Sequence, residues 1–343
     1  MRLSVLDQST VVSGRSPAES IRETLALARH CEALGYERYW LAEHHNSDAV
    51  AGAAPEVLMA AIAATTRRIR VGSAGIMLPH YAALKVAEQF RVLEAIAPGR
   101  IDMGLGRAPG SDGLTAHALN PNAAVAAEHF PAQVRDLLAW VAGEPLVERH
   151  PFRDIRAQPA GPTVPEAWIL GSSDYGAQVA AHFGLPYCFA HFITDGLGAA
   201  EAIALYRDTY RPSARHPAPH AAVCVWALAA ETEAEAERLY SSRALWRLAR
   251  DRGAFVPTPS PEEAAAHDWT EAERQRAAKL RARALVGTGA QVAARLRALA
   301  DDLGVAEVAV LSTAHDPAAR RRSYALLAEA CGLRAEQVTL AAE

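Results

Sequence analysis

Four short segments place polar or charged residues, in two of them together with glycine, directly after an apolar run, and these are the places where chemistry could be done. They are Glu43-His44-His45, Ser73-Ala74-Gly75, Gly106-Arg107 and Ser172-Ser173. Histidine titrates near neutral pH and can move a proton, whereas arginine and serine next to exposed backbone N–H groups suit an anion. The sequence therefore offers a candidate proton-transfer group and a candidate anion site.

A metal centre is a first interpretation of Glu43, His44 and His45 with the nearby His80, because histidine and carboxylate clusters are frequent metal sites. Adjacent side chains on a strand point to opposite faces, so His44 and His45 cannot both reach one ion without a bend. We therefore predict no metal ligands here. Two interpretations stay open: one histidine faces a site, or both make structural hydrogen bonds.

A phosphate site is the interpretation that unites Arg107, Ser172 and Ser173. The guanidinium is a fixed, always-charged fork that matches phosphate geometry. The two serines stand where a helix would begin, so their hydroxyls and amides could complete the site on the positive end of the helix dipole. Taken singly, they could equally be a pair of capping serines and a surface arginine. The residues alone do not separate FMN, a sugar phosphate and a deazaflavin.

The elements that must position these residues alternate between short apolar runs and longer helical patterns, about eight times along the chain. This alternation is typical of a parallel sheet with crossover helices. The expected strands are 3–9, 39–42, 69–75, 101–105, 167–170, 187–190, 223–229 and 307–311. We predict one α/β domain over 1–343, a (β/α)8 TIM barrel, whose catalytic residues follow the strands' C-terminal ends.

Two insertions into the predicted barrel fall at about 143–165 and 231–283. The first carries five prolines, and the second is long, charged and helical in period, with a proline-rich break at 257–261. The second insertion, between strand seven and the last βα elements, is a candidate lid that would order over a bound ligand.

Composition excludes several classes of protein. The net charge of the 343 residues is only -4, so we expect no nucleic-acid partner. The longest apolar runs, such as 57–64, are too short to span a bilayer, and the first residues lack the apolar region of a signal peptide. The four cysteines form no C-x-x-C pair, which favours buried, reduced thiols and a cytoplasmic protein.

Several motifs, in this order, resemble the bacterial luciferase-like flavin-dependent monooxygenases. They are Trp40-Leu-Ala-Glu-His-His-Asn46, Val71-Gly-Ser-Ala-Gly-Ile-Met-Leu-Pro79, Ala87-Glu-Gln-Phe90, Pro98-Gly-Arg-Ile-Asp-Met-Gly-Leu-Gly-Arg-Ala-Pro-Gly110, Leu170-Gly-Ser-Ser173 and Gly184-Leu-Pro186. The resemblance runs from residue 3 to about Leu333. It implies a TIM barrel that binds reduced FMN at its mouth and reacts it with O2 through a flavin C4a-hydroperoxide. It also implies a separate NAD(P)H:flavin reductase and a homodimer.

The resemblance assigns roles to individual residues. His44 matches the catalytic histidine, and Ala74-Gly75 matches a pair joined by a non-prolyl cis peptide against the isoalloxazine. The remaining cofactor-binding positions that it implies are Glu43, Arg107, Ser172, Ser173 and Gly176. The chain departs from the luciferases at Gly106, where they have a reactive cysteine, and at Ser172, which replaces a carboxylate. Light emission from a long-chain aldehyde is therefore not expected.

The reaction that the resemblance implies is the oxygenation of an organic substrate by epoxidation, hydroxylation or Baeyer-Villiger oxidation. An aromatic polyketide is the substrate hypothesis. Three alternatives are kept: a deazaflavin-dependent oxidoreductase, a metal-dependent barrel hydrolase, and a flavin-binding protein without turnover.

Overall fold

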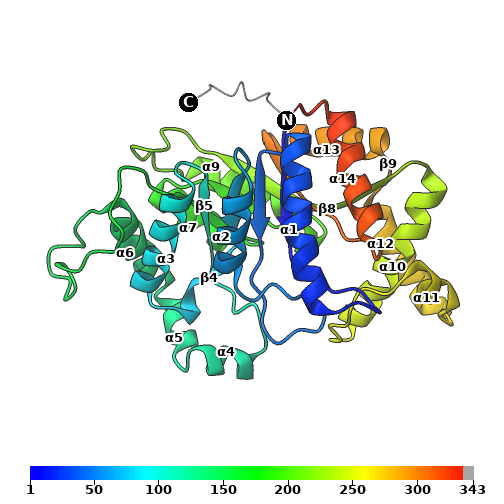
Figure 1. Ribbon diagram of the computed structural model, residues 1–343, viewed down its shortest axis with the longest axis horizontal. Coiled ribbons are helices and arrows are strands. Elements are labelled where there is room, and N and C mark those ends of the chain that lie inside the picture. Colours follow the sequence, from blue (N-terminus) through cyan, green and yellow to red (C-terminus); the bar gives the residue numbers. More distant parts are fainter. Residues whose placement is uncertain (335–343) are drawn as a thin grey trace.

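Eight parallel strands close into a barrel around the centre of the molecule (Figure 1). The computed structural model describes residues 1–334. In their order around the barrel the strands are β1 (Arg2–Asp7), β2 (Arg38–Leu41), β3 (Arg70–Ser73), β5 (Ile101–Gly106), β6 (Glu166–Gly171), β7 (Tyr187–Phe189), β8 (Ala221–Ala230) and β10 (Glu307–Leu311). Strand β10 pairs with both β1 and β8, which closes the barrel and confirms the predicted fold.

A ring of helices covers the outside of the barrel. Its members are α1 (Pro17–Leu34), α2 (Pro55–Thr65), α3 (Ala83–Ile96), α6 (Phe130–Ala142), α7 (Asp174–Phe183), α9 (Ala199–Asp208), α13 (Gly289–Leu303) and α14 (Pro317–Cys331). The sequence predicts both ends of helix α1, because Pro17 favours the start of a helix and Gly35 favours its end. Ser16 and Glu19 form a capping box before Pro17, and Gly35 ends the helix at a left-handed φ of 85°.

Short elements line the loops at the C-terminal ends of the strands. They are β4 (Ile76–Met77), the 3-10 turn η1 (Leu78–His80), α4 (Gly113–Leu119), α5 (Ala123–Glu128) and α8 (His191–Thr194). The helical period of the sequence predicts one helix from 122 to 141. This prediction is wrong, because α5 ends at Glu128 and α6 begins at Phe130. Pro131 explains the break, since proline has no N–H to continue the hydrogen bonds of α5.

The two predicted insertions differ in structure. Residues 143–165 hold neither helix nor strand, and the side chain of Arg91 fixes them by donating to the carbonyl oxygens of Pro159 (2.8 Å) and Thr163 (2.5 Å). Residues 231–283 fold into α10 (Glu233–Asp251), α11 (Pro261–Ala266) and α12 (Glu271–Arg283), which lie to one side of the barrel in Figure 1.

Strand β9 (Leu285–Thr288), which the sequence did not predict, joins this second insertion to the barrel. It pairs in parallel with the outer half of β8, from Ala227 to Ala230. The first half of β8 pairs with β10, so one ten-residue strand belongs both to the barrel and to the base of the insertion. The insertion is therefore attached by a hydrogen-bonded sheet rather than by a loop alone.

The N-terminal end of the barrel is filled by a buried ion-pair network around Arg38, whose exposed fraction is 3%. Its Nε donates to Glu307 of β10 at 2.9 Å, and its Nη1 donates to Asp102 of β5 at 2.9 Å and to Glu166 of β6 at 2.8 Å. These carboxylates raise the pKa of Arg38 against the opposing effect of burial. One guanidinium on β2 thus joins three other strands.

Two indole rings form the next layer above this network. Trp40 and Trp168 meet edge to face with their centroids 5.0 Å apart, and the indole N–H of Trp40 donates to Asp102 at 2.9 Å. Such aromatic pairs contribute about 1 kcal/mol beyond the apolar area that they bury. The interior is therefore solid from the N-terminal end up to this layer.

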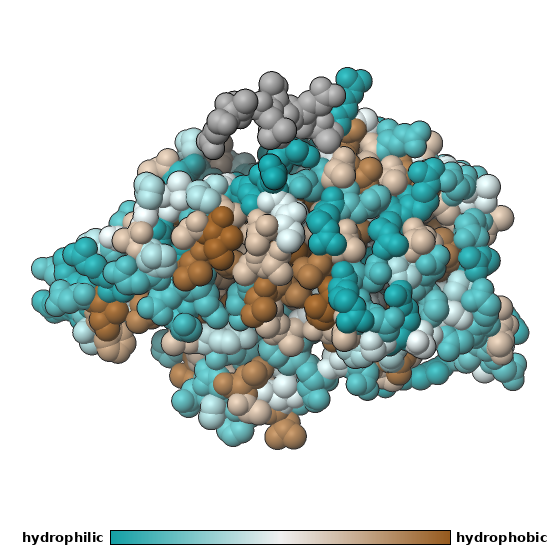
Figure 2. All heavy atoms as spheres, in the orientation of Figure 1, coloured by the Kyte–Doolittle hydropathy of each residue, from teal (hydrophilic) through white to brown (hydrophobic). Residues whose placement is uncertain are grey.

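The surface is mixed in polarity, and Figure 2 shows apolar side chains gathered over α2 and α3. Val57 of α2 and Val92 and Ile96 of α3 are exposed there. No helix in the described part of the chain is both long and apolar enough to cross a bilayer.

We predict that Arg38→Met destabilises the protein by about 3 kcal/mol, because the buried carboxylates of Asp102 and Glu307 lose their shared buried cation and keep only the more exposed Arg70 and Arg2. Urea unfolding followed by circular dichroism measures the change. The matched control is Arg135→Met, which removes a half-exposed guanidinium paired with Asp136 and should change stability by less than about 0.5 kcal/mol. Equal effects of the two substitutions would contradict the role given to Arg38.

Candidate functional site

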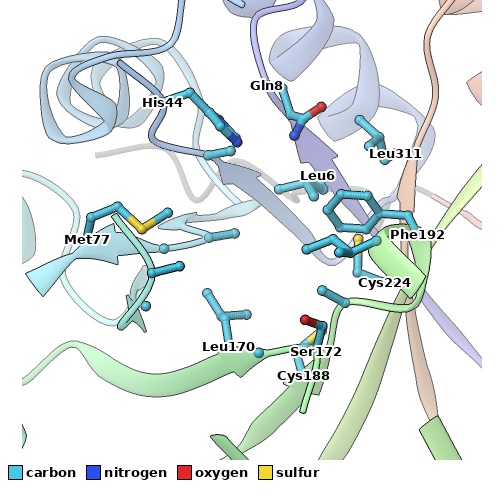
Figure 3. A pocket seen from close by; sticks show the side chains of 18 of the residues that line it. Leu6, Gln8, His44, Met77, Leu170, Ser172, Cys188, Phe192, Cys224 and Leu311 are labelled. Carbon is cyan, nitrogen blue, oxygen red and sulfur yellow. The ribbon is translucent and has the colours of Figure 1, made fainter. Parts of the chain in front are cut away.

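A cavity of about 460 Å³ opens at the C-terminal ends of the barrel strands, above the tryptophan layer (Figure 3). This is the size range of small-molecule and cofactor sites. The cavity brings together seven of the eight site residues predicted from the sequence: His44, Ala74, Gly75, Arg107, Ser172, Ser173 and Gly176. They come from the ends of β2, β3, β5 and β6, so closure of the barrel gathers residues that lie up to 132 positions apart, from His44 to Gly176.

His44 follows β2 directly, and its ring points into the cavity (Figure 3). Its backbone N–H donates to the carbonyl oxygen of Gly52 at 2.9 Å, which fixes the chain after the strand. Its Nδ1 atom is buried and has no hydrogen-bond partner within the described chain. Burial, together with the charges of His45 and Arg250, lowers the pKa of His44 to about 4. The ring is therefore neutral at pH 7 and can accept a proton.

Glu43 and His45, which flank His44 in the loop after β2, do not line the cavity. The fully buried carboxylate of Glu43 accepts hydrogen bonds from the Tyr81 hydroxyl (2.5 Å) and the Met77 backbone N–H (2.9 Å), and it lies 2.8 Å from His45 Nε2. These contacts use both oxygens. The structure therefore corrects the expected cofactor contact of Glu43: it ties the end of β2 to β4 and holds His44 in place.

The Ala74–Gly75 peptide bond is cis, as the family resemblance implies, and it forms part of the cavity wall. The backbone N–H of Ala74 donates to the carbonyl oxygen of Leu41 at 2.6 Å, which fixes the start of the pair. A Cβ on Gly75 would lie 2.9 Å from both the Gly104 carbonyl oxygen and Leu170 Cδ1, too close for any larger residue. This side of the cavity is consequently flat backbone, facing the apolar side chain of Leu170.

Arg107, Ser172 and Ser173 meet at one edge of the cavity, where α7 begins. The guanidinium carbon of Arg107 lies 3.9 Å above the ring of Tyr175, in the first turn of α7. Ser173 is the N-cap residue of α7, yet its hydroxyl makes no capping hydrogen bond, so the capping interpretation is not realised. A guanidinium, two serine hydroxyls and the free N–H groups of a helix N-terminus together form an arrangement suited to a phosphate.

The opposite wall was not predicted. It consists of Phe192 from α8, then Arg243, Trp246 and Arg250 from α10, and Phe255 after it. The sequence showed that 231–283 is helical in period, but helical period alone does not say which face meets the barrel. Cys188 and Cys224 also line the cavity, and burial raises the pKa of both thiols.

No group of three or more histidine, cysteine, aspartate or glutamate side chains within residues 1–334 is placed to hold a metal ion. His80 is instead engaged with the carbonyl oxygen of Pro109, 2.7 Å from its Nε2. The metal-dependent hydrolase alternative therefore lacks a ligand set in this part of the chain.

The mouth of this TIM barrel thus combines an arrangement suited to a phosphate, a flat backbone wall and a buried, neutral histidine. The comparisons with known proteins identify the family. Residues 1–307 match the profile of the luciferase-like monooxygenases, and the chain belongs to this family of flavin-dependent oxidoreductases.

Relatives match the chain over nearly its whole length. The uncharacterized protein YwcH of Bacillus subtilis is 43% identical over 329 residues, which are 96% of this chain and 98% of YwcH. A luciferase-like monooxygenase of Escherichia coli is 39% identical over 325 residues, covering 94% and 95%. The crystal structure of apo-MsnO8 is similar with a TM-score of 0.86 at 37% identity, covering 97% of this chain and 98% of that one.

We predict that the imidazole nitrogens of His44 titrate with a midpoint near pH 4. The folded pKa lies below the ordinary value of about 6.5, so His44 favours folding fully above pH 6.5 and this contribution is lost as the pH falls toward 4. Imidazole nitrogen NMR, with the signal assigned by its loss in His44→Gln, measures the midpoint. A midpoint at or above the ordinary value would contradict the environment described for His44.

Proposed function

We propose that this protein is an FMN-dependent monooxygenase that uses reduced FMN and O2 to oxygenate an organic substrate. The observation that carries the proposal is the single cavity in which the anion site of Arg107, Ser172 and Ser173 and the buried ring of His44 face one space. Membership of the luciferase-like monooxygenase family supports the choice of reaction.

The residues of the cavity fit FMN. Ser173 carries a hydroxyl that is not used by its own helix, and Arg107 makes no ion pair within residues 1–334, so both are free to hold the phosphate. The Ala74–Gly75 backbone and Leu170 lie against each other and form one flat wall that suits a face of an isoalloxazine ring. Bound reduced FMN would supply the two electrons that activate O2.

His44 would manage a proton in this reaction. Its depressed pKa keeps the ring neutral at pH 7, and its Nδ1 has no protein partner, so a proton from a cavity ligand can be accepted and returned there. The backbone bond to Gly52 and the anchoring of Glu43 hold this ring in one orientation. The surrounding apolar side chains would exclude water, which limits the loss of activated oxygen to side reactions.

The substrate would bind against the wall that the second insertion contributes. Phe192, Trp246 and Phe255 give this wall an aromatic character, which supports an aromatic body such as that of a polyketide. The proposal covers epoxidation, hydroxylation and Baeyer-Villiger oxidation of such a substrate. The lid role of 231–283 belongs to the same proposal, because α10 contributes Arg243, Trp246 and Arg250 to the cavity.

Two partners complete the proposal. A separate NAD(P)H:flavin reductase would supply the reduced FMN, an expectation taken from the family resemblance. A homodimer is supported by the apolar surface of Val57, Val92 and Ile96, which would be covered if a second copy packed on α2 and α3.

We predict that Arg107→Ala weakens the binding of reduced FMN by about 10- to 100-fold, because it removes a charge-assisted contact to the phosphate. Ser173→Ala should weaken binding less, since a neutral hydroxyl is lost. Anaerobic titration of the protein with photoreduced FMN measures both affinities. Arg135→Ala, an exposed arginine on α6, is the matched control and should bind as the unchanged protein does.

The same titration separates the cofactor alternatives. Tight binding of reduced deazaflavin with no binding of reduced FMN would replace the monooxygenase proposal with a deazaflavin-dependent oxidoreductase. Binding of reduced FMN without any faster oxidation by O2, and without product, would favour the flavin-binding protein that has lost turnover. In the expected result, His44→Gln binds reduced FMN normally but releases hydrogen peroxide in place of product.

A further inference from the structure

The cavity carries more positive charge than a phosphate site requires. Its lining includes Arg107, Arg243 and Arg250, while among the described residues it includes no aspartate or glutamate. The phosphate of FMN would be held by Arg107 with the serines. Two guanidinium groups, both on α10, are then left without an assigned partner.

Arg243 is the more buried of the two, with an exposed fraction of 9%. Its guanidinium carbon lies 4.0 Å above the ring of Trp226, which fixes the side chain over the middle of β8. Within residues 1–334 no carboxylate lies within ion-pair distance of it: the neighbouring Asp195 is engaged by both terminal nitrogens of Arg247, at 3.1 and 2.9 Å. A buried, fixed and unpaired cation is costly unless a ligand supplies the anion.

Arg243 lies across the barrel from the proposed phosphate site. Arg107 follows β5, and the strand opposite β5 in the eight-membered ring is β10. Trp226, which lies beneath Arg243, pairs in register with Leu311 of β10, and Leu311 lines the cavity. Arg250 stands two helix turns further along α10, on the same face as Arg243, and is near enough to His44 to lower the pKa of that ring. The two α10 arginines therefore border the part of the cavity next to His44.

We propose that Arg243, supported by Arg250, forms a subsite for a carboxylate of the substrate, so that the substrate is an organic acid with an apolar or aromatic body. The guanidinium fork would hold the carboxylate through paired hydrogen bonds, and Phe192, Trp246 and Phe255 would pack against the body. This inference rests on the proposed function, because it places the acid beside the flavin and His44. It adds the class of substrate.

The test uses flavin-free protein, so that its outcome does not depend on the cofactor. Isothermal titration compares a series of phenylalkanoates, from phenylpropanoate to phenylhexanoate, with their neutral amides, which match them in shape. We expect at least one acid of the series to bind about tenfold or more tightly than its amide. Added salt should weaken the binding of the acid and leave the binding of the amide unchanged.

Substitutions locate the subsite. Arg243→Met should reduce the affinity for the acid to that for the amide and should not change the affinity for the amide. Arg243→Lys should keep part of the preference for the acid over the amide. Arg238→Met is the matched control, since Arg238 lies on the same helix but is half exposed and paired with Glu235 and Glu262. It should bind both probes as the unchanged protein does, and circular dichroism checks that each variant is folded.

Three outcomes would overturn the subsite. The first is equal binding of acids and amides, or no binding of either up to about 10 mM, because such binding is too weak for a paired charge. The others are a preference for the acid that survives in Arg243→Met, and a loss of reduced-FMN affinity in Arg243→Met that exceeds its loss of acid affinity. The last would assign Arg243 to the cofactor. A preserved acid preference in a protein that fails to bind reduced FMN would keep the subsite and reject the proposed function.

Discussion

The buried guanidinium of Arg38 is the contact on which the site depends. It joins β2 to β5, β6 and β10 at the N-terminal end of the barrel, and each of these strands delivers a cavity residue at its other end. Because a strand is stiff and its side chains alternate with a period of two, fixing one end of it fixes which residues face the mouth. A polar network is costly in a dry interior unless its members are paired, and here the donors and carboxylates meet in one place.

The two ends of the barrel therefore differ. Charges and the Trp40–Trp168 pair fill the lower half, while the upper half stays open as a cavity. At the mouth, the buried carboxylate of Glu43 fixes the loop after β2, since it ties β2 to β4. Arg38 fixes the strands at the other end in the same way. The barrel itself provides the anion site and His44, and the second insertion provides the aromatic and cationic wall opposite them.

Much of this arrangement could be predicted from the sequence, for physical reasons that particular residues illustrate. The eight strands were found because their apolar runs end at glycine, proline or polar residues, and the ends of α1 were found from Pro17 and Gly35. The break at His129 was missed because helical period continues across it. Strand β9 was missed because four residues are too few to show a period. Glu43 was expected to contact the cofactor because a motif does not show which way a carboxylate points. Arg243 was missed because its place in the cavity wall depends on packing between segments distant in sequence.

The two cysteines in the cavity wall have a consequence for oxidative damage. A thiolate is the form of cysteine that reacts with oxidants, and burial keeps Cys188 and Cys224 in the neutral thiol form. Sulfur is polarizable and packs well against flat rings, so these side chains can line a site for activated oxygen without being consumed by it. Burial therefore protects both thiols from oxidants that reach the cavity, without any other residue having to shield them.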